Sequence, residues 1–312
     1  MQKILSESER GLLEVLVQNS RDTPTSIGLR LGKGRNWVSR TIKNLVDKGV
    51  IRSYTTIVDP AHVKTSRDTI LFMKSNPREQ DVSSRLLQME ELASLDGIAG
   101  DFSLIGFFRF DSQGAFEDLL DRVDNVVASS GTGKYNLVQV LTTYKKNRFK
   151  IVSNESTETH LSSKELGLLR IIRNQKPTED NPFPLTQNTI GKLMNPPMSQ
   201  PAVSKAIEKL LTKGTIAGYS IDIDFSYIRL PVKFFIRMKV LPGTAAETAQ
   251  KLADLDEVWD LYRTSEDFTL FATIRTESIE AINRFLRKLY ENESILDTQS
   301  YISLEEWFVP FH

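Results

Sequence analysis

The chain contains no cysteine, and this absence excludes several classes of protein at once. Without thiols there are no disulfides, no thiolate metal ligands and no cysteine nucleophile, and the cytoplasm is the expected location. Histidine is almost as scarce: His62, His160 and His312 lack metal-ligand spacing, so no metal site is expected. Long apolar runs are also lacking. No stretch approaches the ~20 residues that cross a bilayer, and no membrane partner is expected.

A surplus of charge of one sign is absent from the chain as a whole but present locally. Lys and Arg number 40, as do Asp and Glu, so nothing global indicates a polyanionic partner. Between Ile27 and Ser53, however, seven basic residues stand against one acid, Asp47. The seven are Arg30, Lys33, Arg35, Arg40, Lys43, Lys48 and Arg52. A local basic patch of this kind is typical of a surface that meets nucleic-acid phosphates.

The chain repeats itself in order. The segment "VSRTIKNLVDKGVI", from Val38, returns as "VSKAIEKLLTKGTI", from Val203. Further on, "DFSLIGFFRFDS", from Asp101, returns as "DFTLFATIRTES", from Asp267. The second copy is slightly longer, mostly in the proline-rich segment "KPTEDNPFPLTQN" at 176–188. We expect an N-terminal and a C-terminal domain in each copy, with the boundaries 1–66, 67–150, 151–228 and 229–312.

Each N-terminal part predicts three helices and an extended segment. In the first copy, Ser6 and Glu9 form a capping box that starts the first helix. A second helix is expected over 24–31, and a third from about 36 to 48. Residues 50–60, "VIRSYTTIVDP", then alternate as an extended wing would. This order predicts a winged helix-turn-helix, whose third helix enters the major groove of double-stranded DNA.

The third helix has an apolar and a polar side. Val38, Ile42 and Leu45 follow the i, i+4, i+7 spacing of a buried stripe. The residues predicted to meet DNA in the first copy are Arg35, Asn36, Trp37, Ser39, Arg40, Lys43 and Arg52. Those in the second copy are Ser199, Gln200, Ser204, Lys205 and Lys209. In the second copy Glu208 stands where the first copy has Lys43, and a carboxylate that faces phosphate opposes binding. The second winged helix should therefore bind DNA more weakly or read other bases.

Two alternatives stay open for this helix. An amphipathic helix with basic outward residues is often only a solvated face, and it is the repeated combination with turn and ribbon that favours DNA binding. Trp37 either packs beside Val38 in the core or lies against a sugar or a thymine methyl.

Each C-terminal part predicts the element order β-α-β-β-α-β. The strands of the first copy are expected at 69–74, 97–102, 104–110 and 135–144. Those of the second are expected at 232–240, 258–264, 268–276 and 298–307. This is an α+β fold, a ferredoxin-like layer with helices on one face. The other face, with Phe72, Phe108, Phe235 and Ile274, is too apolar to stay wet and should pair with another sheet.

At these residues the chain resembles the Lrp/AsnC, or feast/famine, family of transcriptional regulators. The resemblance rests on "LSESERGLLEVL" at 5–16, "VSRTIKNLVDKGVIRSYTTIVDP" at 38–60 and "AGDFSLIGFFRF" at 99–110. It implies a winged-helix DNA-binding domain and an αβ domain that senses a small-molecule effector, such as an amino acid, and pairs into dimers. The two αβ domains can pair within one chain as a pseudo-dimer, or between chains as a homo-oligomer.

Family members that sense amino acids carry a Thr-Gly-x-x-Asp turn near the effector pocket. The first copy keeps the glycine but loses the final aspartate, and the second copy keeps neither. By resemblance, the residues placed near an effector are Gly100, Asp101, Ser103, Asp267 and Thr269. A different effector, or none, is the alternative, with Asp101 and Asp267 only capping turns.

A catalytic alternative shares this architecture. Siroheme decarboxylases resemble the same arrangement, with a tetrapyrrole site in the αβ domain. Such a site needs cationic and imidazole groups, and the two αβ segments contain no histidine before His312. Because the first basic helix keeps its charge, we expect a regulator without a cofactor and not an enzyme. A third alternative is an assembly or sensor protein whose heads contact other proteins.

Overall fold

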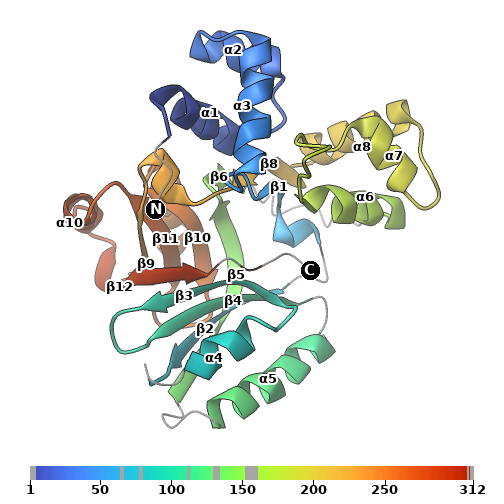
Figure 1. Ribbon diagram of the computed structural model, residues 1–312. Helices are drawn as coiled ribbons and strands as arrows, with labels where there is room; N and C mark the ends of the chain where they lie inside the picture. Colours follow the sequence, from blue (N-terminus) through green and yellow to red (C-terminus); the bar gives the residue numbers. More distant parts are fainter. Residues whose placement is uncertain are drawn as a thin grey trace. The chain divides into compact units, whose positions relative to one another are not determined.

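The computed structural model describes residues 5–63, 67–76, 80–110, 113–128, 134–151, 161–307 and 309. It divides the chain into two compact units, each of which combines matching parts of both copies (Figure 1). The head unit contains residues 1–62 and 149–231, and the barrel unit contains residues 63–148 and 232–312. No helix within the described ranges is both long and apolar enough to cross a membrane.

In the head unit the first copy forms three helices and a strand. They are α1 (Glu7–Gln18), α2 (Pro24–Leu31), α3 (Arg35–Asp47) and β1 (Ser53–Val58), followed by the short η1 (Pro60–His62). The predicted capping box is confirmed. The Ser6 hydroxyl accepts from the Glu9 N–H, and the Glu9 carboxylate accepts from the Ser6 N–H at 2.8 Å. Gly32, at φ 63°, ends α2 in the left-handed conformation that favours glycine.

The second copy repeats this order with an enlarged connection. Its elements are β6 (Phe149–Lys150), α6 (Ser163–Arg173), β7 (Asn174–Gln175), α7 (Gln187–Leu193), α8 (Gln200–Thr212), β8 (Ile216–Asp222) and η2 (Phe225–Ile228). The predicted stripe of α3 is buried, as is the matching stripe of α8, formed by Val203, Ile207 and Leu210. The same spacing therefore packs both third helices against their heads.

A three-stranded sheet of order β7-β1-β8 joins the two copies inside the head unit. Strand β1 pairs antiparallel with β8, from Ser53 opposite Asp222 to Val58 opposite Ile216, and with β7 on its other edge. The predicted extended segment at residues 50–60 forms a strand over Ser53–Val58, and both of its partner strands come from the second copy. Most of β1 is buried, so its backbone groups need partners on both edges, and the second copy supplies them.

In the barrel unit each copy contributes four strands and two helices. The first copy forms β2 (Arg67–Lys74), α4 (Gln80–Leu86), β3 (Leu92–Ile98), β4 (Leu104–Phe110), α5 (Gln113–Ala128) and β5 (Lys134–Lys146). The second forms β9 (Val232–Val240), α9 (Ala245–Ala253), β10 (Val258–Thr264), β11 (Leu270–Thr276), α10 (Ile279–Tyr290) and β12 (Ile295–Trp307). Helices α4 and α5 cover the outer face of the first copy's strands (Figure 1).

The long strands close into an eight-stranded barrel that the sequence did not predict. Their order is β10-β11-β9-β12-β3-β4-β2-β5, and β5 returns to β10. Each copy's last strand pairs with strands of both copies. Strand β12 pairs first with β9, over Ile295–Ile302, and then with β3, over Ser303–Trp307, while β5 joins β2 to β10. The αβ parts therefore pair within one chain.

Aromatic side chains from both copies fill the interior of the barrel. The buried residues there are Ile70, Phe72, Ile98, Phe102, Ile105, Phe107, Val138, Phe235, Tyr262, Phe271 and Tyr301. Phe72 meets Phe271 edge to face with ring centroids 6.0 Å apart. Of the four residues predicted for the paired face, Phe72 and Phe235 point inside, whereas Phe108 and Ile274 pack under the outer helices. Strand β4 is apolar at nearly every position, so alternation could not identify its faces.

Candidate nucleic-acid interface

In each head, the turn between the second and third helices packs directly against a glycine of the second helix. A Cβ added at Gly28 would lie 2.5 Å from the backbone carbonyl oxygen of Lys33, and one at Gly191 would collide with the carbonyl oxygen of Met198. Glycine is therefore required for this close approach in both copies. We did not predict either residue, although a glycine inside a predicted helix is a signal, because it costs stability unless packing needs it.

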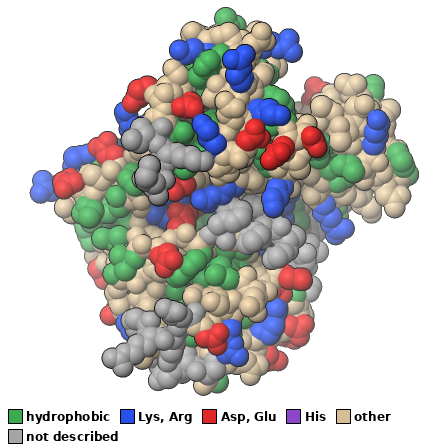
Figure 2. Space-filling view, in the orientation of Figure 1, with side chains coloured by type: hydrophobic (Ala, Val, Ile, Leu, Met, Phe, Trp, Pro, Cys, Tyr) green, Lys and Arg blue, Asp and Glu red, His purple; other side chains and the backbone are tan. Residues whose placement is uncertain are grey.

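Helix α3 presents the predicted polar side to solvent. Arg35, Asn36, Arg40 and Lys43 are exposed, and Ser39 is half-buried. The i, i+4, i+7 spacing of Asn36, Arg40 and Lys43 sets them in one row, on the side away from the buried stripe. Figure 2 shows basic side chains over α2 and the upper part of α3. The arrangement can contact both phosphates and base edges, because a third helix of this type enters the major groove with its N-terminal turns.

Trp37 is neither fully packed in the core nor fully exposed for contact with DNA, the two alternatives that the sequence left open. Its side chain is half-buried, and the Lys33 ammonium lies 5.5 Å from the centre of its ring. A cation over an indole is held electrostatically. Lys33, which we did not include among the predicted contacts, is thereby placed at the start of the same face.

Arg52 lies outside α3, in the connection to the paired strand. It immediately precedes β1, is half-buried, and its backbone N–H donates to the Asp222 carbonyl oxygen at 2.9 Å. Lys43 is exposed, but its ammonium donates to the backbone carbonyl of Glu179 in the second copy at 3.3 Å.

The second head carries a different set of charges. Ser199, Gln200, Lys205 and Lys209 are exposed, and Ser204 is half-buried. Lys209 is engaged within its own head, because its ammonium lies 2.7 Å from the Glu165 carboxylate. Burial raises the pKa of Glu165, but hydrogen bonds from Lys209 and Ser162 outweigh this effect and lower the pKa to about 2. The exposed Glu208 further reduces the positive potential along α8.

His62, which we expected at the surface, is buried with 6% of its area exposed. The Asp59 carboxylate accepts from the Ala61 N–H at 2.9 Å, and this turn folds η1 back onto the head. Burial raises the pKa of Asp59, which is 1% exposed, whereas the Ala61 N–H and the charge of His62 act in the opposite direction. His160 and His312 lie outside the described residues.

The predicted effector residues lie in the turn between β3 and β4 and in the equivalent turn between β10 and β11. Gly100, at φ 140°, and Asp101 are exposed, whereas Ser103 is half-buried. The Ser103 hydroxyl accepts from the Ser75 N–H at 2.6 Å, and its own N–H donates to the Met73 carbonyl. The structure thus explains Ser103 as a turn residue.

In the second turn the residue with the strongest contacts is one we did not predict. Asp267 is exposed, and its carboxylate lies 3.7 Å from the Lys239 ammonium. The Thr269 hydroxyl donates to the Asp267 carbonyl at 3.5 Å, and the Thr269 carbonyl accepts from the Thr264 N–H at 2.9 Å. Their neighbour Glu266 instead accepts from Arg237 and, at 2.5 Å, from Asn136 of the first copy. This turn is therefore tied to the opposite copy through Glu266.

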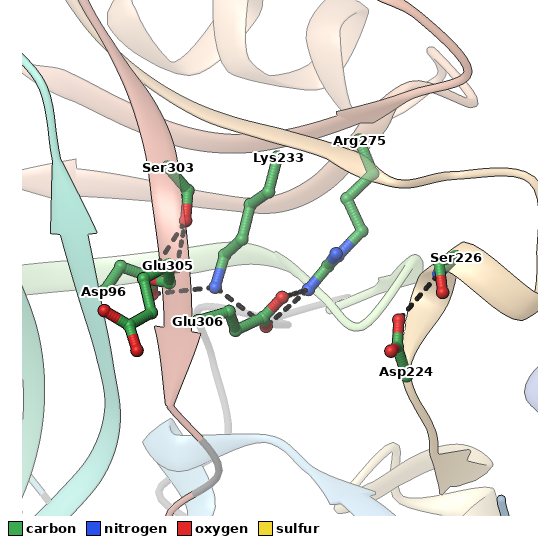
Figure 3. Close-up of polar contacts among 8 residues, drawn as sticks. All are labelled: Asp96, Asp224, Ser226, Lys233, Arg275, Ser303, Glu305 and Glu306. Atoms are coloured by element: carbon green, nitrogen blue, oxygen red, sulfur yellow. Dashed lines mark hydrogen bonds and ion pairs between the residues drawn. The ribbon is translucent and has the colours of Figure 1, made fainter. Parts of the chain in front are cut away.

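A cluster of charges, buried at Asp96, Lys233 and Arg275 and exposed at Glu306, joins the two copies in the barrel unit (Figure 3). On β9, Lys233 donates to Asp96 of β3 at 2.8 Å and to Glu306 of β12 at 3.1 Å. Arg275 of β11 holds both oxygens of Glu306, at 2.6 and 2.8 Å. Burial raises the pKa of Glu306, but Lys233 and Arg275 outweigh it and lower the pKa to about 2. Ser303 donates to Asp96 at 2.7 Å. The cluster therefore ties the pairing of the copies to charge complementarity.

Comparisons with known proteins confirm the predicted resemblance to the Lrp/AsnC family. Residues 233–309 match the family described as "Lrp/AsnC ligand binding domain". The HTH-type transcriptional regulator LysM of Sulfurisphaera tokodaii is 28% identical over 112 residues, covering 36% of this chain and 78% of LysM. The HTH-type transcriptional regulator FL11 of Pyrococcus horikoshii is 27% identical over 138 residues, covering 44% of this chain and 85% of FL11.

Solved structures extend the likeness to almost the whole chain. The crystal structure of the siroheme decarboxylase NirDL is similar with a TM-score of 0.61 at 15% identity, covering 96% of this chain and 92% of that one. Its complex with an iron-uroporphyrin III analogue gives a TM-score of 0.59 at 14% identity over the same shares. At this identity the likeness shows the fold alone. It nevertheless contradicts our expectation that the chain is not an enzyme, because an enzyme has this whole-chain architecture. The scarcity of histidine was too weak a criterion.

Proposed function

We propose that the chain is a sequence-specific, DNA-binding transcriptional regulator of Lrp/AsnC type. In this proposal residues 1–66 and 151–228 are winged helix-turn-helix domains, and residues 67–150 and 229–312 are ferredoxin-like αβ domains. The observation that carries the proposal is the exposed row on α3, which lies opposite the helix's buried stripe and follows a glycine-dependent turn. The regulators LysM and FL11 support it as relatives of similar sequence.

The N-terminal turns of α3 enter the major groove and make the base contacts. Arg35 lies on the phosphate backbone, and Asn36, Ser39 and Arg40 are nearest the bases. An arginine pairs in bidentate fashion with guanine, and an asparagine with adenine, so these side chains can read sequence. The second head contributes through Ser199, Gln200, Ser204 and Lys205. It binds DNA more weakly, or reads other bases, because Glu208 takes the place of Lys43 and repels phosphate.

The two heads act as a fixed pair. Because β1 and β8 belong to one sheet, a half-site bound by the first head places the second head at a defined distance. Half-sites about one helical turn apart, ~34 Å, are expected for such a pair. The barrel unit is the dimer-like frame, and a small-molecule effector, if one is sensed, acts at the turns that contain Gly100 and Asp267.

Selection of bound duplexes from genomic DNA, followed by footprinting, tests this function. We expect protected half-sites of unequal sequence and an affinity that falls linearly with salt on logarithmic axes. Failure to bind any duplex at low ionic strength would overturn the proposal.

A second candidate function is a decarboxylase acting on a tetrapyrrole. The whole-chain likeness to NirDL favours it, and so do the cations Lys146 and Arg237, which lie 5.1 Å from the rings of Tyr262 and Phe72 in the barrel. The aromatic side chains that fill the barrel interior oppose it, because a macrocycle would have to displace them. Adding an iron porphyrin and recording its Soret band separates the two: a saturable shift supports the enzyme, and an unchanged spectrum supports the regulator.

A further inference from the structure

The two heads differ most in one connection. Between α1 and α2 the first copy has only residues 19–23, whereas between β7 and α7 the second copy has residues 176–186. We call residues 176–186 the strap. Its sequence, "KPTEDNPFPLT", contains three prolines, which restrict its backbone. A restricted segment of this length loses less entropy when it docks than a flexible one does.

The strap docks on the first head through its backbone. The Tyr54 hydroxyl donates to the Pro182 carbonyl at 2.6 Å. Lys43 donates to the Glu179 carbonyl, and Arg21 donates to the carbonyl of Leu185 at 3.5 Å. All three donors are side chains of the first copy, and all three acceptors are main-chain oxygens of the second. The first head therefore holds the path of the strap, whatever side chains the strap carries.

The strap is also anchored where it begins. Gln175 pairs with Tyr54 in the register of β7 and β1, and its side-chain oxygen accepts from the Leu185 N–H at 2.7 Å. This bond closes the strap into a loop whose two ends lie together. Pro182, near its middle, is buried under Tyr54, which is 3% exposed. Burial raises the pKa of Tyr54, so the hydroxyl stays a neutral donor at ordinary pH.

The second copy provides a matched tyrosine whose hydroxyl does not bond to the strap. Tyr219 lies at the repeat position of Tyr54 and is also buried, at 9% exposure. Within the described residues its hydroxyl has no hydrogen-bond partner, and the guanidinium of Arg21 lies 5.0 Å from its ring centre. The pair Tyr54 and Tyr219 therefore differs in the one contact at issue.

We infer that the strap determines how much of α3 is available to DNA, an inference that rests on the proposed function. Lys43, the third residue of the exposed row, is bonded to the strap, and the exposed carboxylates of Glu179 and Asp180 lie on the same segment. Carboxylates at this point repel phosphate and shorten the reading surface to the turns that end at Arg40. Lys43 is thus a positioning residue that holds the strap, and it makes no phosphate contact while the strap is docked.

Hydrogen exchange on the full chain without DNA tests the docking. We expect Tyr54→Phe to raise amide exchange across residues 178–185, because it removes the buried bond to Pro182. We expect Tyr219→Phe to leave the same amides unchanged. Equal exchange in the two variants would refute the docking of the strap by Tyr54, and it would leave the proposed function unaffected.

Salt titration on a selected duplex tests the consequence for DNA. Each phosphate contact adds about 0.9 to the slope of log affinity against log salt. We expect Lys43→Gln to leave this slope unchanged in the wild-type background and to reduce it by about 0.9 in the Tyr54→Phe background, where the strap is released. A reduction already in the wild-type background would overturn the inference. Failure of the wild-type chain to bind any duplex would overturn the proposed function and the role in DNA reading together, while the exchange result would still decide the docking.

Discussion

Replacing Lys233 with methionine should destabilise the barrel unit far more than the same change at Lys239 on the same strand. Asp96 is 0% exposed, and after Lys233→Met only the Ser303 hydroxyl remains of the partners described above. Removing one partner of a buried ion pair costs about 3–5 kcal/mol, because the other charge stays in a low dielectric. Lys239 instead pairs at the surface with Asp267, which is 88% exposed. Exposed pairs contribute about 0.2–1 kcal/mol.

Thermal unfolding of the purified variants measures the difference. At about 2–4 °C per kcal/mol, Lys233→Met should lower the Tm of the barrel unit by roughly 6–20 °C. The double variant Lys233→Met with Asp96→Leu tests the cause, because removing both charges should recover most of the lost stability. Equal losses for Lys233→Met and Lys239→Met would refute the reasoning, as would a double variant no more stable than the single one.

Three further predictions concern the heads and pH. Arg40→Ala should weaken binding to a selected duplex by about 1–3 kcal/mol and relax one base position, as measured by anisotropy, and Lys205→Ala should weaken it less. Gly28→Ala should destabilise the head unit by about 1–3 kcal/mol in urea unfolding. Gly34→Ala, which has open space and an ordinary φ of −74°, is its control. The pKa of Glu306, about 2 in the fold against 4.5 ordinarily, is depressed, so its stabilisation is present above pH 4.5 and lost as pH falls toward 2. Urea unfolding of Glu306→Gln should lack that loss.

Local sequence signals were sufficient to predict the bounds of several strands. Strands β4, β9 and β10 run over the predicted residues, because each combines strong periodicity or a continuous apolar run with a clear end. Strand β3 was predicted at 97–102 but runs over Leu92–Ile98. Asp96 is buried in this strand, and the partners that make its burial possible, Lys233 and Ser303, lie far away in the sequence.

Long-range pairing was what the sequence could not show. The extended character of residues 53–58 was predictable, but its partners are β8, more than 150 residues away, and β7. Closure of the barrel likewise depends on β5 and β12 changing partners along their length, for which alternation carries no signal. In the candidate interface the row on α3 was predictable from helical spacing. The engagement of Lys43 was not, because its partner is a main-chain oxygen in the other copy.

The sharing of β12 also limits how this chain can change. Side chains in a strand alternate between faces, so one inserted residue near Ile302 would reverse the facing of every position after it. Those later positions pair with β3, so an insertion in β12 would misplace contacts of the first copy, some two hundred residues upstream. Length variation in β12 should therefore be tolerated only in pairs of residues or beyond its ends.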